Sequence, residues 1–415
     1  MTNNNRIEEL KRLSRAAALR AEEEKRQTDE ANRQADEANR QADEANRQAD
    51  EANRQADEAK RRADELMDQT RPTNLQEYID ACHHLVFSQL AFETDKSLTS
   101  KGTVTDPTNK YCPTSLKPWP DLVEDQRIIY DKLQSAILAI APSFETRIFL
   151  STLGERVSKH RIANERFLQR FLQSAVEYPV EMILKRLTEV EQVRSMYDMG
   201  DGVVFQYHLL ASSDNSREVS EAESQSAPRT PHLDPVSDQS RPNQTYMYRS
   251  DGDPTAMPNM VYVCENTAPH KLTAAHLRAG LQPMNIHRDV VNRTTIPTDA
   301  DPNEHFQYDA ERLTAAALTH VYHFMIHIGL EYGLLTTGEA TVFLKVDWSA
   351  PSTLYYHLVE FNSEVAAHPD SFHFRTAVGQ LLTFTLLALG RPGARRVHGQ
   401  DERDMVKADL KTWDQ

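Results

Sequence analysis

A seven-residue repeat near the amino terminus constrains the fold of this chain more than any other feature. The unit DEANRQA occurs four times without change, beginning at Asp29, Asp36, Asp43 and Asp50, and a variant, DEAKRRA, begins at Asp57. Its alanines recur at alternating intervals of four and three residues, which is the spacing of a heptad with alanine at both seam positions. The repeat therefore predicts a helix and not a strand or a loop.

The residues around the repeat extend this helix. No Gly or Pro occurs between Met1 and Thr70, and acids precede bases by four residues, as in Asp29 and Arg33, which is the favourable order on a helix. We expect one continuous helix over residues 6–67, about 90 Å long at the usual rise per residue. Because alanine buries little area, two interpretations stay open: a weakly pairing coiled coil that forms a homo-oligomer, and a solvated single helix.

Charge and cysteine usage narrow the class of protein. The net charge is −15, which argues against general electrostatic adhesion to nucleic acid or to an anionic membrane. The three cysteines, Cys82, Cys112 and Cys264, are far apart and form neither a zinc pattern nor a disulfide framework,. The sequence shows no secretory signal and no apolar stretch long enough to span a bilayer. We expect an intracellular protein, cytoplasmic or nuclear, with no membrane partner.

Composition and periodicity divide the chain into segments. Arg71-Pro72 ends the repeat helix, so residues 1–70 form the first segment. We expect a helical region over residues 71–160 and an α/β core over residues 161–390. Within the core, residues 211–240 are rich in Ser, Asp, Glu and Pro and predict a disordered insert. Residues 391–415 are polar and charged and predict a solvated tail.

Alternation and helical periodicity predict the elements of the core. We expect strands near residues 203–210, 245–250, 260–264 and 353–359, a hairpin that turns at residues 336–339, and helices near residues 164–191, 273–280, 310–330 and 376–390. The order of a helix, three strands, a helix and further strands predicts an α/β (α+β) fold with strands enclosed between helices.

The third of these strands, in the stretch MVYVCENTAPHKL, ends on a carboxylate, Glu265. This order, with an acid at the end of the third strand, resembles the PD-(D/E)xK nuclease superfamily. The resemblance implies a restriction-endonuclease-like α-β-β-β-α-β core. In that superfamily Pro-Asp begins the second core strand and Glu-x-Lys ends the third. The two carboxylates hold Mg²⁺, and the lysine helps to deprotonate the attacking water.

The chain departs from that motif at two positions. Asn243 follows Arg241-Pro242 where the superfamily has Asp, and Thr267 stands where it has Lys. The amide removes one negative charge from a metal site, and the hydroxyl removes the cation that favours hydroxide, so the rate falls by orders of magnitude. The candidate site residues are therefore the motif positions, one substitute amine and two possible helix acids: Glu265, Asn243, Thr267, Lys271, Glu165 and Glu177. We expect no cofactor, or Mg²⁺ if displaced residues restore a nuclease.

Two further patterns bear on function. The phrases NLQEYIDACHHLVFSQLAFETDKSLTSKG and EYGLLTTGEATVFLKVDW resemble the N-terminal region of a fungal protein group, many members of which continue into a protein-kinase-like domain. Separately, His323 and His327 are four residues apart in the long apolar helix, with His320 on the same stretch. A zinc site is one interpretation, but no H-E-x-x-H pattern is present, so histidines of a core or an interface are favoured.

Three functional hypotheses follow. The lost charges favour a non-catalytic binding module that recognises a nucleic acid or a protein partner. The first alternative is a Mg²⁺-dependent nuclease that works with displaced residues. The second is a truncated regulatory module of a kinase-like protein.

Overall fold

The computed structural model describes most of the chain, and its described residues are 2–102, 104, 106–137, 142–207, 244–250, 259–297, 301–394 and 397–414. The chain divides into two compact units, Met1–Thr70 and Arg71–Gln415. The predicted insert at 211–240 and the motif residue Asn243 lie outside the described residues. No helix in the described part of the chain is long and apolar enough to cross a membrane.

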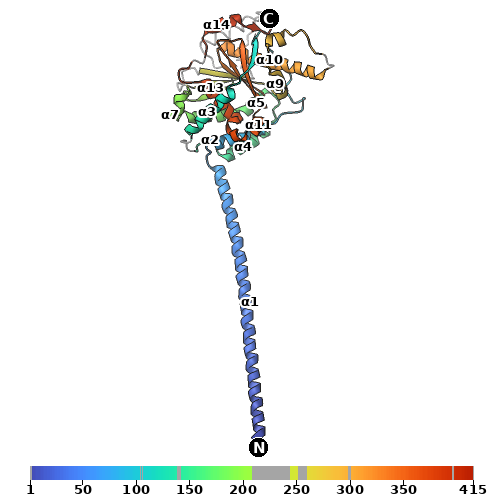
Figure 1. Cartoon of the computed structure of the whole chain (residues 1–415), viewed down its shortest axis with the longest axis vertical. Coiled ribbons are helices and arrows are strands. Elements are labelled where there is room, and N and C mark those ends of the chain that lie inside the picture. Colours follow the sequence, from blue (N-terminus) through green and yellow to red (C-terminus); the bar gives the residue numbers. More distant parts are fainter. Residues whose placement is uncertain are drawn as a thin grey trace, which may run out of the picture. The chain divides into compact units, whose positions relative to one another are not determined.

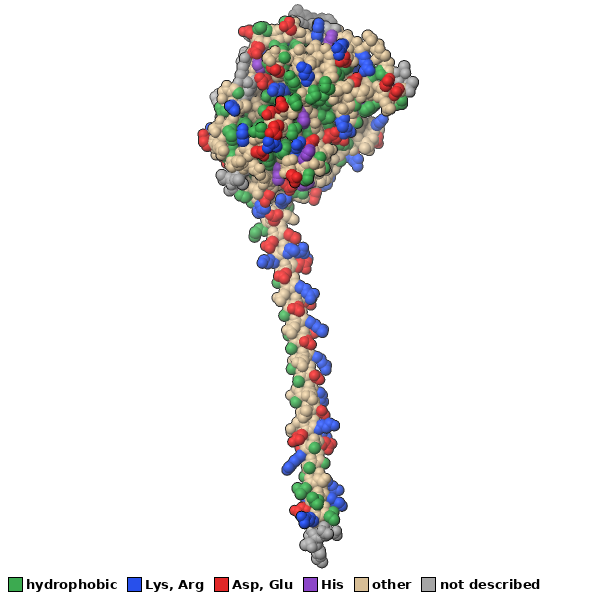
Figure 2. Space-filling view, in the orientation of Figure 1, with side chains coloured by type: hydrophobic (Ala, Val, Ile, Leu, Met, Phe, Trp, Pro, Cys, Tyr) green, Lys and Arg blue, Asp and Glu red, His purple; other side chains and the backbone are tan. Residues whose placement is uncertain are grey.

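The first unit is one helix, α1 (Thr2–Thr70), drawn without interruption in Figure 1. The long N-terminal helix predicted from the repeat is confirmed. Every side chain from residue 6 to residue 70 is exposed, and Figure 2 shows acidic and basic side chains interspersed along it. Within each repeat, Asn and Gln stand beside the alanine seam, so the charged residues lie away from it. Pairing through this seam stays a prediction.

The second unit combines helices with two sheets. Its strands are β1 (Tyr111–Cys112), β2 (Ser115–Pro118), β3 (Val203–Gln206), β4 (Gln244–Arg249), β5 (Asn259–Asn266), β6 (Tyr332–Thr336), β7 (Thr341–Val346), β8 (Thr353–Val359) and β9 (Lys411–Thr412). Its helical elements before β4 are α2 (Leu75–Ala81), η1 (Cys82–Val86), η2 (Phe87–Gln89), α3 (Leu122–Ile137), α4 (Arg147–Ser158), α5 (Glu165–Leu172), η3 (Gln173–Glu177), α6 (Tyr178–Leu187) and α7 (Glu191–Met196). Those after β5 are α9 (Ala274–Gly280), η4 (His287–Val291), α10 (Pro302–Ile328), α11 (Phe361–Ala367), η5 (Pro369–Ser371), α12 (Phe372–Arg375), α13 (Ala377–Leu389) and α14 (Gln400–Asp409).

The larger sheet is mixed and has seven strands in the order β2-β8-β7-β6-β5-β4-β3. Strands β3, β4 and β5 form an antiparallel meander, and helices α9 and α10 then lead to β6, which lies parallel to β5. The remaining neighbours are antiparallel except β2 and β8. The predicted mixed class of helices and strands is confirmed. The small second sheet pairs β1 with β9.

Helices cover both faces of the larger sheet (Figure 1). Successive strand residues point to opposite faces, so Leu334 and Phe343 join one buried cluster while Leu335 and Leu344 join the other. Helices α5, α6 and α13 pack on the first face, and α9 and α10 pack on the second. We refer to these as the α13 face and the α10 face. The β5 strand end is therefore buried from both sides.

Helix α10 is bounded by ordinary local signals. Asp301 accepts hydrogen bonds from the first-turn amides of Asn303 and Glu304, and Pro302 occupies the first position, where its missing N–H costs nothing,. The helix ends at Gly329, whose φ of 89° is in the left-handed region that glycine adopts easily,. Its apolar face packs on the sheet and includes the buried His320, whereas His323 and His327 are only half-buried.

Two segments differ from expectation. Residues 71–160 are not only helical, because β2 pairs in parallel with β8 at the edge of the sheet. Pro118 ends this strand, as an edge position allows. The tail is not wholly solvated either. In α14 the buried Arg403 donates from Nη1 to the carbonyl of His327 at 2.8 Å. The last carbonyls of a helix lack partners within the helix. The guanidinium of Arg403 therefore supplies a hydrogen bond to one of the last carbonyls of α10.

Candidate functional site at the end of strand β5

Glu265 lies on the α10 face of the sheet. It is buried, and its register partner across the meander is Gln244, the first residue of β4. Its Oε2 lies 3.0 Å from Nδ1 of His320, which α10 places against the strand. The distance is that of an ion pair, although the two atoms are not aligned as a hydrogen bond. Glu265 is therefore in close contact with a histidine of α10.

Thr267 and Lys271 follow the strand. The buried Thr267 donates its amide to the carbonyl of Thr336 at 2.9 Å, which continues the β5–β6 ladder. Lys271 Nζ lies 2.7 Å from Oε1 of Glu165, and both side chains are mostly buried. Burial by itself raises the pKa of Glu165, but the hydrogen bond from Lys271, backbone hydrogen bonds and the lysine charge outweigh burial and lower it. The predicted substitute amine is thus engaged by a predicted helix acid.

Glu177 lies on the α13 face. It ends η3, a single π-helical turn between α5 and α6, directly before Tyr178-Pro179. Such turns are frequent at functional sites. The side chain is buried, and Tyr207 donates its hydroxyl to Glu177 Oε2 at 2.7 Å. Burial raises the pKa of Glu177 to about 8, against the lowering effect of the Tyr207 hydrogen bond. The carboxyl is therefore mostly protonated at neutral pH.

The neighbours of Glu177 on β4 and β5 are neutral. Cys264 shares with Glu177 a small cavity of about 40 Å³, which exceeds the size that one water needs. Burial raises the pKa of the Cys264 thiol far above its usual range. Asn266, two residues on, donates from Nδ2 to Oγ1 of Thr245 at 3.0 Å. The strand end on this face therefore presents a carboxylic acid, a thiol, an amide and a hydroxyl.

These residues do not fit a magnesium ion. Mg²⁺ binds oxygen ligands in near-octahedral geometry, whereas this group offers one carboxyl, Glu177, beside a thiol, an amide and a hydroxyl. Among the described residues, no group of three or more His, Cys, Asp and Glu side chains is arranged to hold a metal ion.

The structure separates some of the predicted site residues and joins others. It brings Glu165 to Lys271, and it places Glu177 and Glu265 on opposite faces of the sheet. The roles assigned to the six candidates stay predictions. Sequence reasoning missed Thr245, Cys264 and Asn266. The period of two along a strand places Cys264 and Asn266 on one face and Glu265 on the other, and that signal was present in the sequence.

The other histidines of α10 have structural contacts. His323 accepts at Nδ1 the backbone amide hydrogen of Tyr111 at 3.0 Å, and its ring stacks on that of His327 with centroids 6.0 Å apart. These contacts tie β1 to the α10 helix. They are the contacts of a packed interface within the fold.

Comparison with known proteins places the chain in a family. The model of the Spore killer 2 N-terminal domain matches residues 73–414, and the chain belongs to this family. A relative is the meiotic driver SPOK2 of the fungus Podospora anserina, which is 28% identical over 373 residues. The match covers 83% of this chain and 46% of the relative, so the chain spans about half the length of that protein. No solved structure matches the chain.

Proposed function

We propose that the second unit, Arg71–Gln415, is a nuclease-like module of a spore-killer-type system that acts by binding a partner and not by cutting. Two observations support a nuclease-like scaffold. The antiparallel meander β3-β4-β5, the helical crossover and the parallel strand β6 follow the α-β-β-β-α-β order. The start of β4 and the end of β5 are also neighbours, since Gln244 pairs with Glu265. The partner is a nucleic acid or a protein.

The state of Glu177 carries the proposal that the module binds and does not cut. Metal-dependent hydrolysis needs clustered carboxylates that are charged at neutral pH. On the α13 face the buried acid Glu177 has a pKa of about 8, and its strand neighbours Cys264 and Asn266 bring no charge. On the α10 face, Glu265 Oε2 lies 3.0 Å from His320 Nδ1. Both faces at the strand end thus resemble packed, weakly charged surfaces.

The test is to restore the missing charges on each face separately. The first variant combines Asn243→Asp with Cys264→Glu and Asn266→Lys, which rebuilds the motif beside Glu177. The second combines Asn243→Asp with Thr267→Lys, which rebuilds it around Glu265. Each full-length variant and the wild type are titrated with Mn²⁺ by calorimetry, after circular dichroism has shown that they fold.

Our proposal predicts that Mn²⁺ binds a restored variant and does not bind the wild type. The variant that binds shows which face of the sheet carries the motif. Binding of Mn²⁺ by the wild type, followed by cleavage of a nucleic acid, contradicts a binding-only role. If the triple variant does not fold, Cys264→Asp alone places a second carboxyl beside Glu177 and serves the same comparison.

One observation favours the nuclease alternative. Lys271 and Glu165 lie 2.7 Å apart in a mostly buried pair, and an amine beside an acid is the pairing that displaced catalysis would use. A nuclease of this kind predicts that Lys271→Gln abolishes any Mn²⁺-dependent cleavage by the wild type. The regulatory-module alternative is supported by the relative's greater length.

A further inference from the structure

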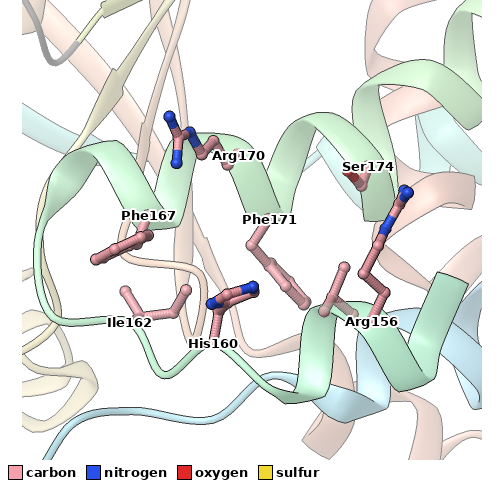
Figure 3. A pocket seen from close by; sticks show the side chains of 8 residues that line it. Arg156, His160, Ile162, Phe167, Arg170, Phe171 and Ser174 are labelled. Carbon is pink, nitrogen blue, oxygen red and sulfur yellow. The ribbon is translucent and has the colours of Figure 1, made fainter.

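A second candidate site lies between α4 and α5, apart from the strand end of β5. Figure 3 shows the pocket, with Phe167 and Phe171 on one helix and Arg156 on the other. Its volume is about 210 Å³. The residues that line it are Arg156, Val157, His160, Ile162, Phe167, Arg170, Phe171 and Ser174. None of them belongs to the group around Glu177.

The pocket lies in a basic stretch of an acidic chain. From Arg156 to Arg170 the sequence contains five Lys and Arg residues and a single acid, Glu165, against a net charge of −15 for the whole chain. Glu165 is already held by Lys271 at 2.7 Å. Within the described ranges, neither Arg156 nor Arg170 has an ion-pair partner. Two exposed guanidinium groups that form no ion pair among the described residues therefore line the pocket, which favours an anion,.

The walls of the pocket are flat and apolar. The half-buried Phe167 ring and the exposed His160 ring are parallel to within 9°, with centroids 6.4 Å apart. Ile162 is buried beneath them, and its backbone exchanges hydrogen bonds with the chain at Ala91 and Glu93 at 2.8 and 3.1 Å. The backbone of Ile162 is therefore tied to a distant segment, while the neighbouring Phe167 and His160 are half-buried and exposed.

We propose that this pocket binds a nucleotide, either free or as a unit of a single strand. A base offers a flat π face, and aromatic side chains stack on such faces with little regard to sequence. A phosphate offers the anionic oxygens that guanidinium groups bind through paired hydrogen bonds. Figure 3 shows Arg156 extending from α4 toward Ser174, at the opposite end of the pocket from Phe167. A base on Phe167 and His160 leaves its phosphate toward Arg156.

The inference does not depend on the proposed function, because it uses other residues. The test uses the full chain and isothermal titration with AMP, beside adenosine, which lacks the phosphate, and inorganic phosphate, which lacks the ring. A ten-nucleotide single strand of deoxyadenosine tests whether the pocket takes a free nucleotide or a unit of a single strand. The variant is Arg156→Gln. Its matched control is Lys159→Gln, which removes the same charge from a neighbouring exposed residue outside the pocket lining.

We expect AMP to bind more tightly than either fragment. Arg156→Gln should weaken binding by about tenfold or more, the loss expected for a hydrogen bond to a charged group. Lys159→Gln should change it by less than about twofold. If the ten-nucleotide strand binds more tightly than AMP and loses affinity by a similar factor in Arg156→Gln, the site is assigned to single-stranded nucleic acid. Equal losses in the two variants, equal binding of phosphate and AMP, or no binding of any probe overturns the proposal. Phe167→Leu, which keeps an apolar wall but removes the flat ring, tests the stacking separately.

Discussion

The two units of this protein hold their structures by different means. In α1 every described side chain from residue 6 onward is exposed, and its ion pairs, such as Arg61 with Glu65, join residues four apart. In the second unit the informative contacts join residues far apart in sequence, such as Glu165 with Lys271 and Glu265 with His320. A helix held only by near neighbours cannot bury a carboxylate or enclose a pocket. The unusual chemistry is therefore confined to the second unit.

The two units can also be observed separately. All three tryptophans, Trp119, Trp348 and Trp413, lie in the second unit, and α1 contains no aromatic residue. Tryptophan fluorescence therefore reports on the second unit alone, while far-ultraviolet circular dichroism reports on both. The effect of a mutation can be assigned to one unit by comparing the two signals.

The largest effect should come from the centre of the α13 face. Phe384 is fully buried, and its ring lies 4.9 Å from that of Phe343 and 5.3 Å from that of Tyr262. Phe384→Ala should lower the free energy of unfolding by about 3–5 kcal/mol, because it removes buried apolar area and leaves a cavity. Denaturant unfolding followed by tryptophan fluorescence measures this. The same deletion at the exposed Phe149 should cost less than about 0.5 kcal/mol,. Similar costs at both positions would contradict the assigned core.

The next effect concerns pH. The pKa of Glu177 is raised from 4.5 to about 8, so the folded state holds a proton that the unfolded state releases. The stabilisation this gives is complete below pH 4.5 and is lost as the pH rises through about 8,. Glu177→Gln should remove this loss. The free energy of unfolding of the variant minus that of the wild type should therefore increase by several kcal/mol from pH 5 to pH 8. The size follows because one pKa unit corresponds to about 1.4 kcal/mol.

Unfolding of both proteins by denaturant at the two pH values, read by tryptophan fluorescence, measures this difference. As a control, Glu37→Gln on α1 should leave the tryptophan-detected transition unchanged at both. If the stability difference between the wild type and Glu177→Gln is the same at pH 5 and pH 8, Glu177 is ionised in the folded protein. That result would remove the main support for a neutral strand end.

The smallest effect belongs to α1. Ala42→Gly should cost about 1 kcal/mol of local helix stability, seen as reduced circular dichroism with no change in the tryptophan-detected transition. Arg40→Gly has a similar propensity cost but lies away from the alanine seam. If two copies pair weakly through the seam, sedimentation at high concentration should show a larger loss of association for Ala42→Gly than for Arg40→Gly. Equal sedimentation of both variants and the wild type would favour the single solvated helix.

The sequence predicted well where structure is local or strictly periodic. The heptad placed α1, and alternation placed β5, β6, β7 and β8 close to their observed bounds. It failed where pairing is distant. The short strand β2 exists because β8 lies beside it, and α14 packs because Arg403 reaches a carbonyl at the end of α10. Neither partner is visible in a local pattern, because each interaction joins segments more than 70 residues apart.

The candidate site shows the same division. The chain alone determined that Asn243 and Thr267 bring no charge to the predicted motif positions, and that a long helix precedes a mixed fold, because composition and period are local properties. Only the tertiary structure decided that Glu265 meets His320 while Glu177 meets Tyr207 and the Cys264 face. The charge state of a buried acid depends on the solvent that packing removes and on the groups that packing brings near, and both come from other parts of the chain.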